Sequence, residues 1–167
     1  SLPYGDYISL LEKTGCIFHK TLIDRRGMNP YKDIQLLLQY NRLIREIKPD
    51  VVLTYTIKPN IYGGIICRWH HVRYIANVTG LGTAVEKGGF LSEILLFLYK
   101  AGLKSAWQVF FQNESNRNFF IEKKLVRKDK LIPGSGVNLK EHCYEDYPAE
   151  SEEIHFLYVG RIMRDKG

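Results

Sequence analysis

The sequence predicts an α/β fold in which a parallel sheet is flanked by helices. Two observations lead to this class: strand-like and helix-like segments alternate from about residue 16 to residue 132, and residues 51–55 form a continuous apolar run. Such alternation is typical of parallel sheets, because each strand needs a crossover helix to bring the chain back to the same edge. With 167 residues, 45% of them hydrophobic and 25% charged, the chain has the size and composition of one globular domain plus a short further segment.

The first predicted pair is a helix followed by a strand. The helix is expected from Asp33, as its N-cap, to about Lys48, because its apolar residues fall near one face and Pro49 stops it. The apolar run Val51–Tyr55 is expected to be a strand that is buried on both faces, as central strands of parallel sheets are.

The second pair repeats this order. A short helix is predicted from Pro59 through Ile66, and its paired Gly63 and Gly64 would allow it to pack close to the sheet. The next strand is predicted at Arg73–Asn77.

A glycine-containing loop follows this second strand. Residues 78–89 contain four glycines at what would be the carboxyl end of a parallel strand. Ligands of open α/β sheets bind at that edge, so we expect a binding site in this loop.

The remaining predicted elements begin with a strongly apolar helix, Phe90–Ala106. It has so few polar positions that two interpretations stay open: a core helix, or a helix that lies partly against an anionic membrane surface. In the second interpretation the basic residues of this region would face the lipid: Lys100, Lys104, Lys123, Lys124, Arg127, Lys128 and Lys130. The predicted elements after this helix are a strand at 109–112, a helix at 114–124 and a strand at 130–132.

The pattern of the last residues predicts a linker followed by the start of a second domain. Residues 141–153 contain six acids, no Lys or Arg, and Pro148, which is typical of a linker. Ile154–Val159 is expected to be a new buried strand that ends at Gly160. The predicted organisation is therefore one domain at 1–140, a linker at 141–153, and the first strand and turn of a second domain at 154–167.

Charge and cysteine content narrow the functional classes. Residues 1–140 carry 21 Lys and Arg against 11 Asp and Glu, a surplus that could attract nucleic acid, anionic lipid or a phosphate-bearing substrate. The three cysteines have no metal-site spacing, which predicts a reducing cytosol and no structural metal. We also expect no signal peptide and no transmembrane span, hence a cytoplasmic protein.

Several motifs together resemble one protein family. The spacing of Gly160-Arg161 and Lys166-Gly167 is similar to the start of the second domain in glycosyltransferase family 4. Five further segments are similar to successive motifs of the branch that makes capsule, O-antigen and N-linked glycans: 24–30, 55–63, 77–82, 111–116 and 132–138. This branch includes transferases that add N-acetylhexosamine to a polyprenyl-diphosphate-linked sugar.

The resemblance implies a fold and a reaction. The fold would be the Rossmann-like N-terminal domain of a GT-B protein, truncated at both ends and lacking its first strand unit, with the second domain barely begun. The reaction would be a retaining, metal-independent transfer from a nucleotide-diphosphate sugar, expected to be UDP-linked, to a lipid-linked glycan. No cofactor is implied, and the expected location is the cytoplasm or the inner face of the cell membrane.

The resemblance also implies site residues. Arg161 and Lys166 would be catalytic by stabilising the departing diphosphate, and together with Gly160 they would bind the donor. The acceptor would contact five residues: Lys58, Asn60, Thr79, Gly80 and Gly82. On local pattern alone, Asn60 could instead cap its helix, and Gly160-Arg161 could be a solvated turn.

Two rival functions remain at this level. A GT-B-like nucleotide-sugar epimerase would need acid and base residues in the cleft, and these loops contain no paired carboxylates. A nucleic-acid-binding module would need exposed aromatic rings, whereas the aromatic residues from Phe90 to Phe111 are expected to follow strand and helix patterns. We expect no nucleic-acid partner, and we expect this chain alone to have little or no transferase activity.

Overall fold

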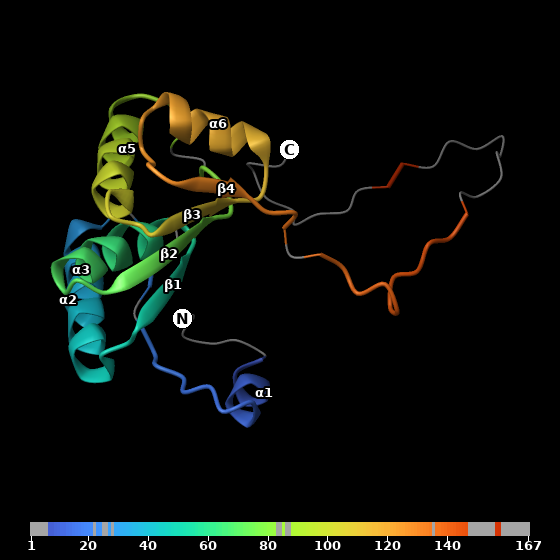
Figure 1. Cartoon of the computed structure of the whole chain (residues 1–167), viewed down its shortest axis with the longest axis horizontal. Coiled ribbons are helices and arrows are strands. Elements are labelled where there is room, and N and C mark those ends of the chain that lie inside the picture. Colours follow the sequence, from blue (N-terminus) through green and yellow to red (C-terminus); the bar gives the residue numbers. More distant parts are fainter. Residues whose placement is uncertain are drawn as a thin grey trace. The chain divides into compact units, whose positions relative to one another are not determined.

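The protein is described by a computed structural model covering residues 7–21, 23–24, 27, 29–82, 85, 88–134, 136–146 and 156–157. It divides into two units, Ser1–Ile132 and Pro133–Gly167. The first unit holds a sheet with helices packed on it (Figure 1). In the second unit, the described residues form turns and irregular segments without helix or strand.

Among the described residues the sheet has four strands and is fully parallel, as the sequence predicts. Its strands lie side by side in chain order, so each crossover moves the chain on by one strand. In the register, Thr54 lies opposite Ala76, and Ala76 lies opposite Val109. The strands are β1 (Val51–Tyr55), β2 (Arg73–Val78), β3 (Gln108–Phe111) and β4 (Asp129–Leu131).

The helices agree with the predicted order and add one element. A short helix near the start of the chain, α1, was not predicted from the sequence. The predicted helix at 59–66 is a π-helical turn, η1, that continues into an α-helix. The helices are α1 (Ile8–Lys13), α2 (Pro30–Ile47), η1 (Pro59–Gly63), α3 (Gly64–Trp69), α5 (Phe90–Leu103) and α6 (Glu114–Glu122).

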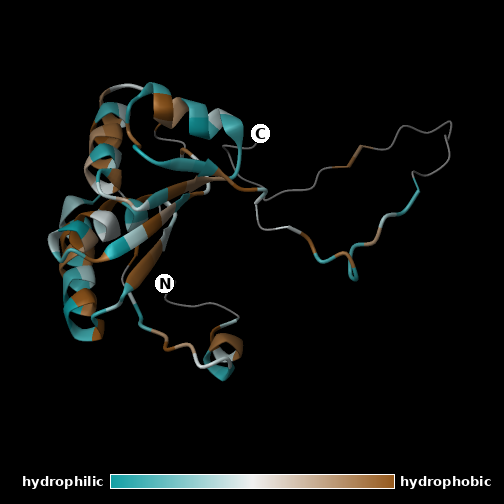
Figure 2. Ribbon diagram, in the orientation of Figure 1, coloured by the Kyte–Doolittle hydropathy of each residue, from teal (hydrophilic) through white to brown (hydrophobic). Residues whose placement is uncertain are grey.

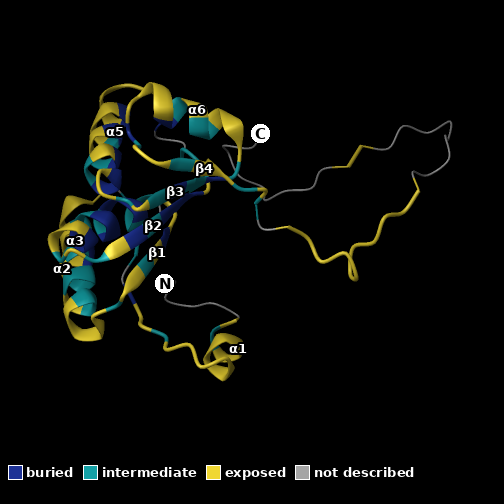
Figure 3. Ribbon diagram, in the orientation of Figure 1, coloured by how far each residue is buried: buried dark blue, intermediate teal, exposed yellow. Residues whose placement is uncertain are grey.

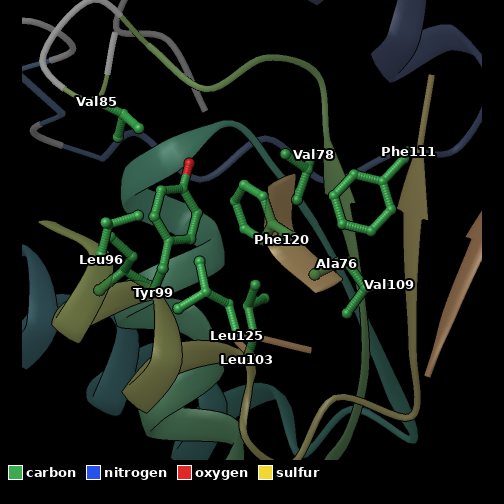
Figure 4. Packing of buried hydrophobic residues seen from close by; sticks show 11 residues of the cluster. Ala76, Val78, Val85, Leu96, Tyr99, Leu103, Val109, Phe111, Phe120 and Leu125 are labelled. Carbon is green, nitrogen blue, oxygen red and sulfur yellow. The ribbon is translucent and has the colours of Figure 1, made fainter. Parts of the chain in front are cut away.

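The hydrophobic core lies between one face of the sheet and the helices η1, α5 and α6. Figure 4 shows Phe120 between Tyr99 and Phe111, with ring centroids 5.0 and 5.3 Å away in edge-to-face geometry. Figure 3 shows buried parts of α3, α5 and β2 in dark blue. The strands contribute alternate residues to this core: Ala76, Val78, Val109 and Phe111.

The prediction that β1 is buried on both faces is wrong. Val51, Leu53 and Tyr55 point to one face and are about half exposed, whereas Thr54 points to the other face and is buried. Burial of a strand depends on what covers it, and β1 is an edge strand of the described sheet. Its apolar composition therefore does not by itself bury it.

The prediction that Asp33 caps α2 is also wrong. The cap is Asn29, whose side-chain oxygen accepts from the backbone N–H of Tyr31, and Pro30 occupies the first helical position. Proline suits that position because its missing N–H would have no helical partner. Asp33 is thus left free for a different contact.

The paired glycines allow close packing on the sheet, because a Cβ on either would meet a sheet side chain, Thr54 for Gly63 and Tyr74 for Gly64. A Cβ on Gly63 would lie 3.2 Å from Thr54 Cγ2, while a Cβ on Gly64 would meet the carbonyl oxygen of Gly102 in α5. A Cβ on Gly102 would in turn lie 2.6 Å from Cα of Ile61 in η1. This small-residue contact brings η1 and α3 directly against α5.

The predicted second domain is largely outside the described residues. Of the strand expected at 154–159, only Phe156 and Leu157 are described, and they are exposed and lie in neither helix nor strand. The first compact unit ends at Ile132, ahead of the predicted linker at 141–153.

Candidate functional site

The carboxyl ends of β1 and β2 bring the predicted acceptor residues to one edge of the sheet. Because the strands are parallel and paired from Val51 opposite Arg73 to Tyr55 opposite Asn77, the segments that follow them leave the sheet side by side. The first of these segments carries Lys58 and Asn60, and the second carries Thr79, Gly80 and Gly82.

Lys58 lies in a largely buried ion pair. Its ammonium donates to Oδ1 of Asp33 at 2.5 Å and to the carbonyl oxygen of Gly27 at 2.8 Å, with only 14% and 18% of the Lys58 and Asp33 side chains exposed. An ammonium has three N–H donors, so these contacts use two of them. Through Asp33 in the first turn of α2 and Gly27 just before that helix, Lys58 therefore connects α2 to the segment that follows β1.

Tyr62 completes this cluster. Its hydroxyl donates to Oδ2 of Asp33 at 2.9 Å. Burial, followed by the hydrogen bond and the negative charge of Asp33, raises the pKa of Tyr62 well above its usual range. The hydroxyl thus stays protonated, and the Asp33 carboxylate is held on both oxygens. We refer below to Asp33, Lys58 and Tyr62 as the Asp33 cluster.

Asn60 is fully buried and does not cap a helix. Lys58 precedes η1 as its N-cap residue, and the Asn60 side-chain NH₂ donates to the carbonyl oxygen of Asn77 at 2.9 Å. Asn60 thereby joins η1 to the end of β2, directly before the glycine-containing loop. Within the described part of the chain, Oδ1 of Asn60 and Oδ1 of Asn77 have no hydrogen-bond partner.

The loop after β2 folds back toward Lys58. Thr79 is exposed, Gly80 has open space around it, and Gly82 has φ +84°. A Cβ on Gly82 would lie 2.5 Å from Cδ1 of Ile57, the neighbour of Lys58. The loop then re-enters the core at Val85, which packs in the same cluster as Leu96 and Tyr99 (Figure 4).

The structure thus brings the five acceptor candidates together in different environments. Thr79 and Gly80 are accessible, and the loop folds back toward Ile57 at Gly82. Lys58 is partly buried, and Asn60 is fully buried beneath the loop. The donor and catalytic candidates Gly160, Arg161 and Lys166 lie outside the described residues.

Sequence reasoning missed the role of Asp33 because it treated that residue as a helix cap. The available signal was Asn29-Pro30, a strong helix start one turn earlier. With the cap assigned to Asn29, an acidic residue in the first turn becomes available for a tertiary contact.

An apolar groove of about 550 Å³ lies between α2 and β1, and Pro59, the neighbour of Lys58, is part of its wall. Its wall includes Leu43, Ile44 and Ile47 of α2 and Cys67 of α3. Burial raises the pKa of Cys67 to about 11, so this thiol is not a nucleophile near neutral pH.

The described residues show neither a metal-binding cluster nor a membrane-spanning helix. They contain no group of three or more His, Cys, Asp or Glu side chains able to hold a metal ion. Among the same residues, no helix has both the length and the apolarity to cross a bilayer.

Comparison with known proteins gives one family. Residues 8–113 match the model of a family described as glycosyl transferase 4-like. The chain is 27% identical over 183 residues to a protein of Campylobacter jejuni named N,N'-diacetylbacillosaminyl-diphospho-undecaprenol alpha-1,3-N-acetylgalactosaminyltransferase. That alignment covers 99% of this chain and 49% of the relative.

Two further similarities are weaker. An uncharacterized glycosyltransferase of Methanocaldococcus jannaschii is 25% identical over 154 residues, covering 83% of this chain and 38% of the relative. The crystal structure of Acinetobacter baumannii MurG superimposes with a TM-score of 0.50 at 15% identity, covering 84% of this chain and 37% of MurG, which supports the fold alone. The chain thus spans half or less of the length of the curated relatives it matches.

Proposed function

Because the chain belongs to the glycosyl transferase 4-like family, we propose that the protein transfers a hexose or N-acetylhexosamine from a UDP-sugar to a polyprenyl-diphosphate-linked glycan. The observation that carries this proposal is the relative whose name specifies sugar transfer onto a diphospho-undecaprenol-linked sugar, aligned over 99% of this chain. The product would enter surface polysaccharide synthesis, such as capsule or O-antigen.

In the proposed function, the acceptor binds at the edge of the sheet formed by the carboxyl ends of β1 and β2. Thr79 and the backbone at Gly80 are accessible there, so they would contact the acceptor directly. Lys58 would offer its remaining N–H donor to an acceptor hydroxyl or diphosphate oxygen, while Asn60 would hold the loop in place from inside.

The proposed chemistry is a retaining transfer without a catalytic metal. The sugar carbon gains positive charge as the diphosphate leaves, so fixed cations that face the diphosphate stabilise the transition state more than the ground state. Arg161 and Lys166 would supply those cations, with Gly160 allowing the backbone to approach the phosphates. The protein would work in the cytoplasm, on the inner face of the cell membrane where a lipid-linked acceptor is held.

A mass-spectrometric transfer assay tests this proposal. The whole protein is incubated with UDP-hexoses or UDP-N-acetylhexosamines and a short-chain polyprenyl-diphosphate monosaccharide, and the acceptor should gain one sugar. The free monosaccharide, lacking the lipid diphosphate, is the control and should not react. Conversion of the donor into its epimer without acceptor, followed by chromatography or NMR because epimers have equal mass, would instead identify an epimerase. Absence of any donor turnover would overturn the proposal.

A further inference from the structure

The helix α5 presents a second apolar face in addition to the one in the core. Its inner side contributes Leu96, Tyr99 and Leu103 to the core. Its outer side exposes large apolar residues at helical spacing: Phe90 (82% exposed), Leu91 (40%), Ile94 (40%) and Phe97 (71%). We call these four residues the α5 outer face. Figure 2 colours most of α5 as hydrophobic, and Figure 3 shows exposed segments on the same helix.

This exposure answers a question that the sequence left open. One side of α5 packs in the core, and the opposite side is apolar and exposed to solvent. It also corrects the expectation that the aromatic residues of this region are inside: Phe90, Phe97 and Trp107 are exposed, whereas Tyr99 and Phe111 are buried. Two phenylalanines on one exposed helix face are unfavourable in water, so a partner for this face is expected.

Cations gather at the C-terminal end of the same helix. Lys100 is exposed on α5, and Lys104, its C-cap residue, is exposed as well. Arg68 of α3 donates to the carbonyl oxygen of Ala101 at 3.1 Å. Glu93 is the single acid on α5. An apolar half followed by a cationic half matches the boundary of an anionic bilayer, where rings enter the acyl region and Lys or Arg lie at the headgroup phosphates.

We propose that the α5 outer face, with Arg68, Lys100 and Lys104, docks the protein on an anionic lipid surface. This inference rests on the proposed function, in which the acceptor is anchored in a membrane. It adds a geometric consequence: α5 begins directly after Gly88 and Gly89, at the end of the loop that starts with Thr79. Docking through α5 therefore places the proposed acceptor loop at the membrane surface.

Vesicle co-sedimentation of the whole protein tests the docking surface. Binding to vesicles containing phosphatidylglycerol should exceed binding to pure phosphatidylcholine and should weaken as salt is raised. Phe90→Ser with Phe97→Ser should lower binding by tenfold or more, because each ring loses its transfer from water into lipid. Lys100→Gln with Lys104→Gln should lower binding to the anionic vesicles roughly fivefold per charge and leave binding to neutral vesicles unchanged.

A matched control comes from α2, where Ile34 and Leu38 are both 58% exposed. Ile34→Ser with Leu38→Ser removes two exposed apolar side chains from another helix and should leave vesicle binding unchanged. Circular dichroism should show all variants folded, and the lysine variants keep the test valid if the phenylalanine variants unfold.

Several outcomes would overturn the docking surface. These are no binding to anionic vesicles, equal loss in the α2 control, or tight salt-sensitive binding to RNA or DNA without binding to vesicles. A dimer in analytical ultracentrifugation that separates in the phenylalanine variant would show that a second copy covers the face.

Sugar transfer to a detergent-dissolved short-chain acceptor should persist in the phenylalanine variant. If that transfer fails in every variant while vesicle binding stands, the proposed function fails and the docking surface does not.

Discussion

Lys58 and Asp33, 25 residues apart in the sequence, form an ion pair that joins the first turn of α2 to the segment following β1. The pair is largely buried, and both oxygens of the carboxylate are used, by Lys58 and by Tyr62. The segment it fixes includes Ile57, against which the glycine loop folds. The pair is therefore both a structural contact and the support of the candidate site.

Asp33→Asn should destabilise the protein, because it leaves the Lys58 ammonium partly buried without its counter-charge. Loss of one partner from a charged, shielded hydrogen bond costs about 2 kcal/mol, which urea unfolding followed by circular dichroism would detect. Glu46→Gln is the matched control, since Glu46 pairs with Arg42 on the exposed side of the same helix. An equal shift of the urea midpoint in both variants would contradict the special role of the Asp33 cluster.

The two glycines of the acceptor loop should respond differently to alanine. Gly82→Ala introduces a side chain at φ +84° and against Ile57, so it should cost about 1–2 kcal/mol and displace the loop. Gly80→Ala meets nothing within 4 Å and should leave stability unchanged. Thermal unfolding compares the two, and the Gly82 variant should also show a raised KM for the lipid-linked acceptor. An unchanged KM in a folded Gly82→Ala protein would separate the loop from acceptor binding.

The three cysteines should differ in reactivity. Cys16 and Cys143 are exposed, whereas burial raises the pKa of Cys67 from 9.0 to about 11. At pH 8 iodoacetamide should therefore modify two thiols rapidly and Cys67 only after unfolding, as peptide mass mapping would show. Because the folded pKa is raised, the stabilisation from keeping Cys67 protonated is complete below pH 9 and is lost as pH rises toward 11. Rapid modification of Cys67 in the folded protein would show that α3 opens locally.

The sequence was sufficient for the order of strands and helices in the sheet, because apolar runs and their breaks are local signals. It was insufficient where burial depends on neighbours. Leu53 and Tyr55 belong to an apolar strand but lie at the edge of the described sheet, and Phe97 belongs to an apolar helix with only one side in the core. No local pattern distinguishes such residues from core residues.

The site shows the same division. The turn segments after β1 and β2 could be predicted, since glycines and polar residues at strand ends are visible in the sequence. The Lys58 contact with Asp33 could not, because it joins segments whose approach depends on how α2 packs. The burial of Asn60 likewise follows from η1 packing against α5 at Gly102.

The proposed transfer reaction depends most directly on Arg161 and Lys166, so their substitution is the sharpest kinetic test. If they stabilise the departing diphosphate, Arg161→Ala and Lys166→Ala should each lower kcat about a hundredfold or more, with the KM for the acceptor nearly unchanged. Arg161→Lys should restore part of the rate, since it keeps the charge but loses the planar set of donors. Arg164→Ala, in the same segment, is the control for a general loss of positive charge. If kcat falls as far in the Arg164 variant as in the Arg161 variant, positive charge anywhere in this segment is sufficient. The assignment of leaving-group stabilisation to Arg161 and Lys166 is then wrong.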